Sequence, residues 1–354
     1  MAIAPIQGVS TTLVTIPVTP IRAVAPAVRA DVEIAQAKTP PTPEAAAAEA
    51  RTRAVAEAVQ TAAPRQSALA PLFADLGEAL KSRALPREVQ AAAAQVLAQA
   101  TPLTARLDGA AIARAFAQSG LFLEHNLGAR PNASPAGRDL KADLLSLRGA
   151  LAAWLGEEAP AARPRAQTGP PPPFRGGPTA AQPAVRAQLP ADASPTAVGA
   201  RLAEDAEGAL ARHELLQAAS LPGRADPGEA PGARWMFEIP FTTPQGAQVA
   251  QFEISRDDPE TAAQRSGRGA TFRARFSIDL EPLGPIHAQV ALSGERAGVN
   301  LWAERAASVE VLRRTRPWLS EALARASITA DIGIHPGAPP AAQAGAGRFL
   351  DQTT

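Results

Sequence analysis

The sequence predicts an α+β protein: a small two-layer C-terminal domain, made of an antiparallel-rich sheet and one long helix, preceded by a mostly disordered Ala/Pro-rich region with a few helices. Three observations lead to this class. Prolines interrupt the chain repeatedly before about residue 233. After Arg234, apolar residues alternate with polar ones, which is the period of half-buried strands. A stretch from about Ser308 to Ala326 then carries apolar residues at helical spacing. A helix and a sheet that each have one apolar face pack together as two layers.

The composition indicates that much of the chain is weakly packed. Its 354 residues include 35 Pro and 26 Gly, aromatic residues make up only 4%, and Tyr is absent. The hydrophobic share of 46% is inflated by Ala, which buries little area per residue. Codon bias explains part of this composition equally well, since three Lys stand against 32 Arg.

The same counts exclude several kinds of site. The chain has no Cys, which excludes disulfides and thiolate metal sites, and its net charge of +1 gives no overall field that favours nucleic acid. No apolar run reaches the roughly 18 residues of a membrane span. The N-terminal residues lack the basic and apolar regions of a secretory signal, so we expect any export to use another route.

We expect residues 1–66 to be disordered, because prolines interrupt each short apolar run, and residues 67–157 to form a helical segment. The first helix of that segment has one apolar face, formed by Leu69, Leu72, Phe73, Leu76 and Leu80. Pro86 is suited to begin a second helix, and Asp108 and Asp139 are predicted to cap a third and a fourth. These apolar faces either pack on each other as a small bundle or form a docking face for a partner.

Residues 158–193 are predicted to be a Pro-rich linker, in which the run 169–174 should be an extended polyproline II helix. Recognition of this run as a PxxP ligand is an alternative. A helix is expected over 194–220, with a Ser-Pro start, and a loop over 221–233.

Residues 234–336 are predicted to form the C-terminal domain, and 337–354 a disordered tail. Alternation predicts five strands, at about 235–241, 250–254, 272–280, 286–292 and 299–303. The long helix follows, and Pro317 within it should cause a kink or a restart. Residues 328–334 should form a closing strand.

No catalytic constellation is visible in the sequence. The four His residues fall in different segments, at His125, His213, His287 and His335. The chain has no nucleophile elbow, Walker A loop or dinucleotide-binding glycine motif. We therefore expect no enzyme, no metal site and no cofactor. The cluster of Arg313, Arg314 and Arg316 is expected to be a solvated helix side, with contact to an acidic partner or nucleic acid as the alternative.

The order and spacing of motifs after residue 276 suggest a family. A strand ends in Leu-Glu-Pro-Leu-Gly-Pro-Ile at 280–286, two alternating strands follow, and a helix carries Val-Leu-Arg at 311–313 and Pro-Trp-Leu-Ser-Glu-Ala-Leu at 317–323. This pattern resembles the C-terminal domain of the flagellar hook-length control protein family, with its Leu-x-Pro-x-x-Leu-Gly-x-Val and Leu-Arg…Leu-Pro-x-Leu-Arg-x-x-Leu signatures. Two departures are a shorter Pro-to-Leu-Gly spacing and Ala326-Ser327 where a Gly commonly follows the helix.

The resemblance implies a non-enzymatic regulator that is cytoplasmic before export and is then secreted through the flagellar type III apparatus, which is its only connection with the membrane. Its N-terminal part, with an export signal within residues 1–66, would act as a molecular ruler. Its C-terminal domain would contact the export-gate switch protein and change export specificity from rod/hook to filament substrates. Hook or hook-cap subunits are further expected partners, whereas nucleic acid and small-molecule substrates are not.

By position in the motif, the resemblance marks four partner-binding residues: Pro282, Leu283, Gly284 and Ile286. A purely structural turn explains the Leu-Gly pair equally well, because Gly has the backbone freedom that a turn needs. Trp302 is the natural anchor of such a contact, since Trp is favoured at binding hot spots. It is out of phase with the apolar residues of its strand and should face away from them, unless the helix covers it.

Two other functions stay open. The first is a cytosolic interaction or adaptor protein with a helical module and an α+β binding domain, which would remain inside the cell. The second is an enzyme whose site is not visible in the sequence; it would require an apolar pocket with convergent polar groups.

Overall fold

The computed structural model describes residues 43–82, 85–104, 107–129, 139–156, 169–190, 192–222, 233–256 and 271–340. The predicted disorder of residues 1–42 and 341–354 concerns residues outside these ranges. The α+β class is confirmed, with a seven-stranded sheet in the C-terminal region and helices in the N-terminal part.

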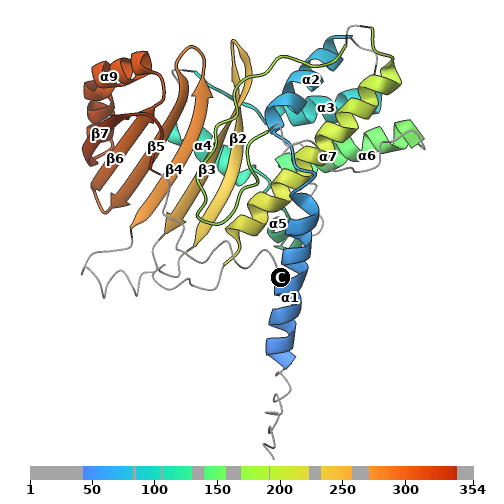
Figure 1. Cartoon of the computed structure of the whole chain (residues 1–354), viewed down its shortest axis with the longest axis horizontal. Helices are drawn as coiled ribbons and strands as arrows, with labels where there is room; N and C mark the ends of the chain where they lie inside the picture. The colour runs from blue at the N-terminus through green and yellow to red at the C-terminus, as the bar shows by residue number, and fades with distance from the viewer. Residues whose placement is uncertain are drawn as a thin grey trace, which may run out of the picture. The chain divides into compact units, whose positions relative to one another are not determined.

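The strands lie in the sheet in their order along the chain (Figure 1). They are β1 (Thr101–Pro102), β2 (Arg234–Thr243), β3 (Gly246–Arg256), β4 (Phe272–Leu280), β5 (Gly284–Ser293), β6 (Arg296–Ala303) and β7 (Thr329–Pro336). Neighbours from β2 to β6 are antiparallel, whereas β1–β2 and β6–β7 are parallel. Sequence alternation predicted β2 to β7. It missed β1, because two residues are too few to show a period.

The helices are α1 (Pro43–Ala62), α2 (Leu69–Ser82), α3 (Arg87–Ala98), α4 (Gly109–Ala117), α5 (Leu123–Ala129), α6 (Leu140–Leu155), α7 (Pro195–Ser220) and α9 (Ala306–Arg325). The predicted caps are present: the side chains of Asp108, Asp139 and Ser194 each accept a hydrogen bond from the backbone N–H three residues later. Among the helices of the described ranges, none is both long enough and apolar enough for a membrane span.

Two helical features differ from expectation. Helix α1 occupies 43–62, where the sequence predicts disorder; most of it is exposed, and its end packs Ala62 against Ala211 and Leu215 of α7. This anchor comes from a distant segment, so no local apolar stripe reveals it. Helix α9 runs through Pro317 without a restart. The carbonyl that loses its donor belongs to exposed Arg313, where water can replace the missing N–H.

The sheet has one apolar face, which is covered by α4 and α9. Phe237, Ile239 and Phe241 of β2 pack in one cluster with Ile278 and Ile286. Ile112 and Phe116 of α4, and Val309 and Leu312 of α9, pack against the same cluster. Farther along α9, Leu319 and Leu323 contact the apolar side chains of β6 and β7. This is the predicted pairing of a sheet with a long helix, extended by α4.

The helical segment is not a separate module. The core formed by α2, α3, α6 and α7 includes Val249 of β3, which is completely buried. The helical segment and the sheet belong to one compact unit, which begins at Ala48. The boundary that the sequence indicates at about residue 233 is therefore a change in residue composition, while packing continues across it.

Residues 169–190, which we call the strap, fall within the range 158–193 that was predicted to be a Pro-rich linker, and they pack against the sheet. The strap crosses β2, β3 and β4 on the face opposite to α4 (Figure 1). Gln182 forms a β-bridge with Val249, and the carbonyl of Pro170 accepts a hydrogen bond from Gln66. Periodicity missed this packing because the strap is held by single polar side chains from distant segments and by two separate apolar residues, Val185 and Leu189, which form no periodic pattern.

Candidate functional site

Four of the five residues marked by the sequence lie at the turn between β4 and β5: Pro282 and Leu283 in the turn itself, and Gly284 and Ile286 at the start of β5. Arg305, which immediately precedes α9, donates hydrogen bonds to both carboxylate oxygens of Glu281, at 2.8 and 3.0 Å, and to the carbonyl of Pro282 at 2.7 Å. Ser308 in the first turn of α9 donates to the carbonyl of Leu283 at 2.5 Å. We call residues 280–286, held by Arg305 and Ser308, the clamped turn.

Gly284 is required at the clamped turn for two physical reasons. Its φ is +76°, a left-handed conformation in which a side chain is strained. A Cβ at this position would also lie 2.4 Å from Nε of Arg305. The Arg305 side chain thus occupies the space that any larger residue would need, which gives the Leu-Gly pair a structural role.

The clamped turn carries both signs of charge on an exposed surface. The hydrogen bond from Arg305 lowers the pKa of Glu281, and the same bond raises the pKa of Arg305. Burial raises the pKa of Asp279 in β4, and the negative charge of Glu281 adds to this effect. The Arg305–Glu281 pair is bidentate but open to solvent, so we assign it to holding the turn geometry rather than to overall stability.

Only part of this predicted site is open to a partner. Pro282 is exposed and Leu283 is half-buried against the apolar core, whereas Gly284 and Ile286 are buried. The exposed surface of the clamped turn therefore consists of Pro282 with the Glu281–Arg305 pair.

Trp302, the fifth marked residue, does not join the clamped turn. Its neighbour across the strands is His287, and it lies on the face of the sheet opposite to Ile286. It faces away from Leu301 and Ala303, as its phase predicts, and α9 packs on the other face. Trp302 is nonetheless 9% exposed and stacks on His335 of β7, with ring centroids 5.1 Å apart.

The strand register brings together a row of side chains that sequence reasoning did not connect. The row crosses β2 to β7 on one face and consists of Glu238, Gln251, Ser277, His287, Trp302 and His335. Each of these residues is out of phase with the apolar residues of its strand. The sequence does contain a signal for this row. If neighbouring strands are paired outwards from the turn that joins them, the residues that alternate with the apolar ones fall opposite each other.

Within this row, a chain of hydrogen bonds has the composition of a nucleophile, a base and an acid. Ser277 Oγ lies 2.7 Å from Nδ1 of His287, whose Nε2 lies 3.0 Å from a carboxylate oxygen of Glu304. Ser277 is completely buried, however, and its hydroxyl donates to the carbonyl of Thr179 in the strap at 3.0 Å. The arrangement fastens the strap and leaves no route for a substrate to the hydroxyl.

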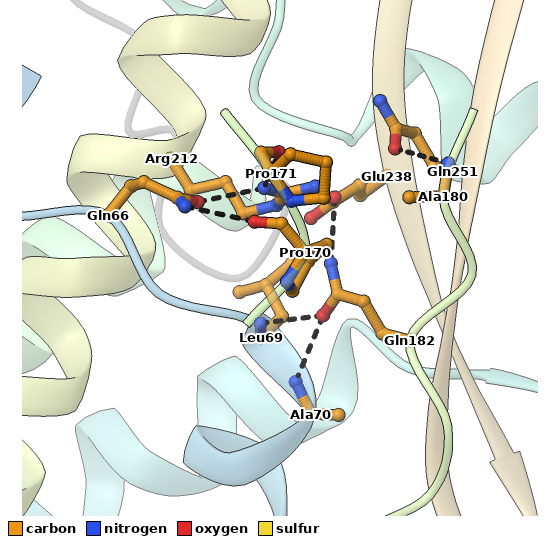
Figure 2. A network of polar contacts seen from close by, with 10 residues as sticks. All are labelled: Gln66, Leu69, Ala70, Pro170, Pro171, Ala180, Gln182, Arg212, Glu238 and Gln251. Atoms are coloured by element: carbon orange, nitrogen blue, oxygen red, sulfur yellow. Dashed lines mark hydrogen bonds and ion pairs between the residues drawn. The ribbon is translucent and has the colours of Figure 1, made fainter. Parts of the chain in front are cut away.

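A second polar network joins four distant segments: α7, β2, the strap and the start of α2 (Figure 2). Arg212 of α7 donates to Glu238 of β2 at 2.7 Å, and both side chains are 1% exposed. Gln182 of the strap donates to the same Glu238 oxygen at 2.7 Å. Its own amide oxygen accepts from the backbone N–H of Leu69 at 2.8 Å and from that of Ala70 at 3.4 Å. Gln182 thus accepts hydrogen bonds from backbone N–H groups at the start of α2 and donates one to Glu238 of the sheet.

Within the residues that the structure describes, no group of three or more His, Cys, Asp or Glu side chains could hold a metal ion. Arg313, Arg314 and Arg316 lie on the exposed part of α9, as expected of a solvated helix side.

Comparison with known proteins gives one result. Residues 259–343 match the family model described as flagellar hook-length control protein FliK, a range that contains β4 to β7 and α9. This match confirms the resemblance noted over residues 276–334. No curated protein and no solved structure matches the chain significantly.

Proposed function

We propose that this chain acts in flagellar hook-length control, as an exported ruler whose C-terminal domain switches type III export from rod/hook to filament substrates. The family match to residues 259–343 carries the proposal. The matched range holds the clamped turn and the helix that clamps it, so the family pattern falls on a structurally coherent unit.

In this proposal the clamped turn is the contact with the export-gate switch protein. Pro282 and the Glu281–Arg305 pair offer an exposed, rigid surface with one apolar and two charged groups. Gly284 and Ile286 act indirectly, by holding that surface in place from within. The N-terminal region contacts hook or hook-cap subunits during export. The protein is cytoplasmic before export and secreted afterwards.

Export and measurement both require unfolding of the compact unit of residues 48–354. A chain without Cys has no disulfide to block passage through a narrow channel. Residues 1–233 in fully extended form would span roughly 770–840 Å, at about 3.3–3.6 Å per residue. The ruler state is therefore a different conformation from the folded state described above.

The packing of the helices onto the sheet favours a second candidate, a cytosolic adaptor. The shared core and the strap network fix the helical segment to the sheet, as in a protein that works folded. Such an adaptor would stay inside the cell, whereas the ruler leaves it.

The deciding experiment is an immunoblot of the culture medium for the tagged full-length chain, in hosts with and without a functional flagellar export apparatus. Export that depends on the apparatus supports the ruler; retention in both strains contradicts it and supports the adaptor.

In parallel, deletion of residues 271–336 should give over-long hooks without filaments by electron microscopy. Normal hooks and filaments in that strain would rule out the switching role.

A further inference from the structure

The outer side of α9 carries the most exposed large apolar side chain in the described part of the chain. Trp318 is 67% exposed, compared with 55% for Phe174 and 45% for Leu221. A Trp at this exposure leaves most of its large apolar area in water, so its position needs an explanation.

Trp318 lies on α9, and the opposite side of this helix packs against the sheet. Val309, Leu312, Leu319 and Leu323 face the sheet. On the outer side, helical spacing places four residues in line with Trp318, at i−7, i−4, i+3 and i+7. They are Val311, Arg314, Glu321 and Arg325. We call these five residues the outer stripe.

The outer stripe and its surroundings are basic. Helix α9 contains four Arg and two Glu. Arg313 is paired with Glu310 at 2.7 Å. For Arg314 and Arg325 no ion pair is found within the described residues, and both are exposed. Trp and Arg are two of the residue types that are enriched at protein–protein hot spots.

We propose that the outer stripe is a docking surface for an acidic protein surface with an apolar recess that receives Trp318. Burial of the ring would supply affinity, and the two unpaired arginines would supply attraction and orientation. Glu321 is the only carboxylate of the stripe, and its negative charge opposes this attraction. Replacing it with a basic residue should therefore strengthen binding.

The geometry disfavours an anionic membrane as the occupant. A helix binds a bilayer surface by burying a broad apolar face in it. The broad apolar face of α9 is covered by β6 and β7, which leaves only Val311 and Trp318 on the outer stripe.

The outer stripe and the clamped turn can be covered by the same partner. Ser308 of the clamp and Trp318 are ten residues apart, which is about 15 Å along a helix. An ordinary interface buries about 800 Å² on each partner and spans more than this distance. The choice of partner below rests on the proposed function, because it uses the switch protein as the probe.

The test measures binding of the full-length chain to the purified cytoplasmic domain of the host's export-gate switch protein, by fluorescence anisotropy. We expect Trp318→Ala to weaken binding about tenfold or more, and Arg314→Glu to weaken it about three- to tenfold. Glu321→Arg should strengthen binding, and the effects of both charge changes should shrink between about 50 and 300 mM salt. Phe174→Ala, which removes another exposed aromatic ring, is the matched control and should bind like wild type.

Equal binding by the Trp318→Ala and Phe174→Ala variants, with circular dichroism showing both folded, would overturn the docking surface. So would the absence of wild-type binding, or tighter binding of wild type to phosphatidylglycerol vesicles that Trp318→Ala abolishes. The proposed function is judged separately by export into the medium and by hook length, neither of which depends on this binding measurement.

Discussion

Gly284 shows how one residue of a family-like motif can be constrained by geometry. Its positive φ and the adjacent guanidinium of Arg305 both exclude a side chain. Gly294, in the turn between β5 and β6, has a similar φ of +58° but open space around it. A side chain at Gly294 would therefore meet backbone strain alone, whereas one at Gly284 would meet both backbone strain and a steric conflict with Arg305.

We predict that Gly284→Ala lowers the free energy of unfolding by about 2–4 kcal/mol, and that Gly294→Ala lowers it by only about 1 kcal/mol. Urea denaturation followed by circular dichroism measures both. Combining Gly284→Ala with Arg305→Ala should recover part of the loss, because the conflicting side chain is gone. Equal losses at the two glycines would show that Arg305 adds no steric constraint.

His213 and Asp139 give opposite contributions to stability as pH changes. Burial lowers the pKa of His213 to about 4, with a further contribution from the positive charge of Lys141. The neutral ring hydrogen-bonds the backbone of Gly120, and its Nε2 has no partner within the described residues. Burial also raises the pKa of Asp139, the N-cap of α6, to about 6.

For His213, the unfolded chain takes up a proton more readily than the folded one, because the folded pKa is the lower. The stability that neutral His213 contributes is present above about pH 6.5 and is lost as pH falls towards 4, by up to about 3 kcal/mol. We predict that His213→Gln removes this loss. Urea midpoints at pH 7 and pH 4.5 should then fall less for the variant than for wild type; an identical fall in both would contradict the prediction.

For Asp139 the sign is reversed, because the folded pKa is the higher. Its contribution favours the folded state at low pH and is lost as pH rises from about 3.8 through 6. Asn caps helices about as well as Asp and does not titrate. Relative to wild type, Asp139→Asn should therefore gain stability steadily between pH 4 and pH 7, which the same denaturation series measures.

At the scale of elements, the strap is held by polar contacts along its length and by Val185 and Leu189, which pack against the helical core. Gln182 links the strap to the start of α2 and to buried Glu238. Arg175 and Arg186 within the strap are two potential trypsin sites. Release of the strap should therefore be visible as proteolysis.

We predict that Gln182→Ala lowers the free energy of unfolding by about 2–4 kcal/mol, because it leaves buried polar groups without partners. Trypsin cleavage after Arg175 and Arg186, identified by mass spectrometry, should become faster. Gln245, which lies in the exposed turn between β2 and β3, supplies the control, and Gln245→Ala should change neither measurement. Unchanged cleavage in the Gln182 variant would mean that the strap is held elsewhere.

At the scale of the whole molecule, the helical segment and the sheet should unfold together. The core of α2, α3, α6 and α7 reaches Val249, and the Arg212–Glu238 pair crosses from α7 to β2. Removing one partner of a buried ion pair is costly, since it leaves the other charge uncompensated. A sheet without α7 would be destabilised in this way, because Glu238 would lose Arg212.

We predict that an isolated fragment of residues 233–340 is less stable than the full chain by at least about 3 kcal/mol. Urea unfolding followed by Trp fluorescence reports on this fragment, which retains Trp235, Trp302 and Trp318. The fragment 48–354, which retains the whole compact unit, should match the full chain. A 233–340 fragment as stable as the full chain would show that the sheet and α9 form an autonomous domain.

Local signals in the sequence were enough for most elements. The two-residue period predicted β2 to β7, and side-chain caps placed the starts of α4, α6 and α7. The positions of Pro282 and Gly284 in a turn also followed from residue type. These features depend on interactions between residues close together in the chain, so each can be predicted from a short segment of sequence.

The sequence by itself determined the α+β class, the strands β2 to β7 and the long helix between the last two of them, whereas the order of the strands in the sheet came from the structure. The tertiary structure alone decided that the strap packs, that β1 joins the sheet, and that Trp302 is buried while Trp318 is exposed. It also assembled the Arg212–Glu238–Gln182 network from segments 26 and 56 residues apart along the chain. The physical reason is range: periodicity and capping act between near neighbours, whereas burial of a polar side chain depends on partners that only the folded chain brings into contact.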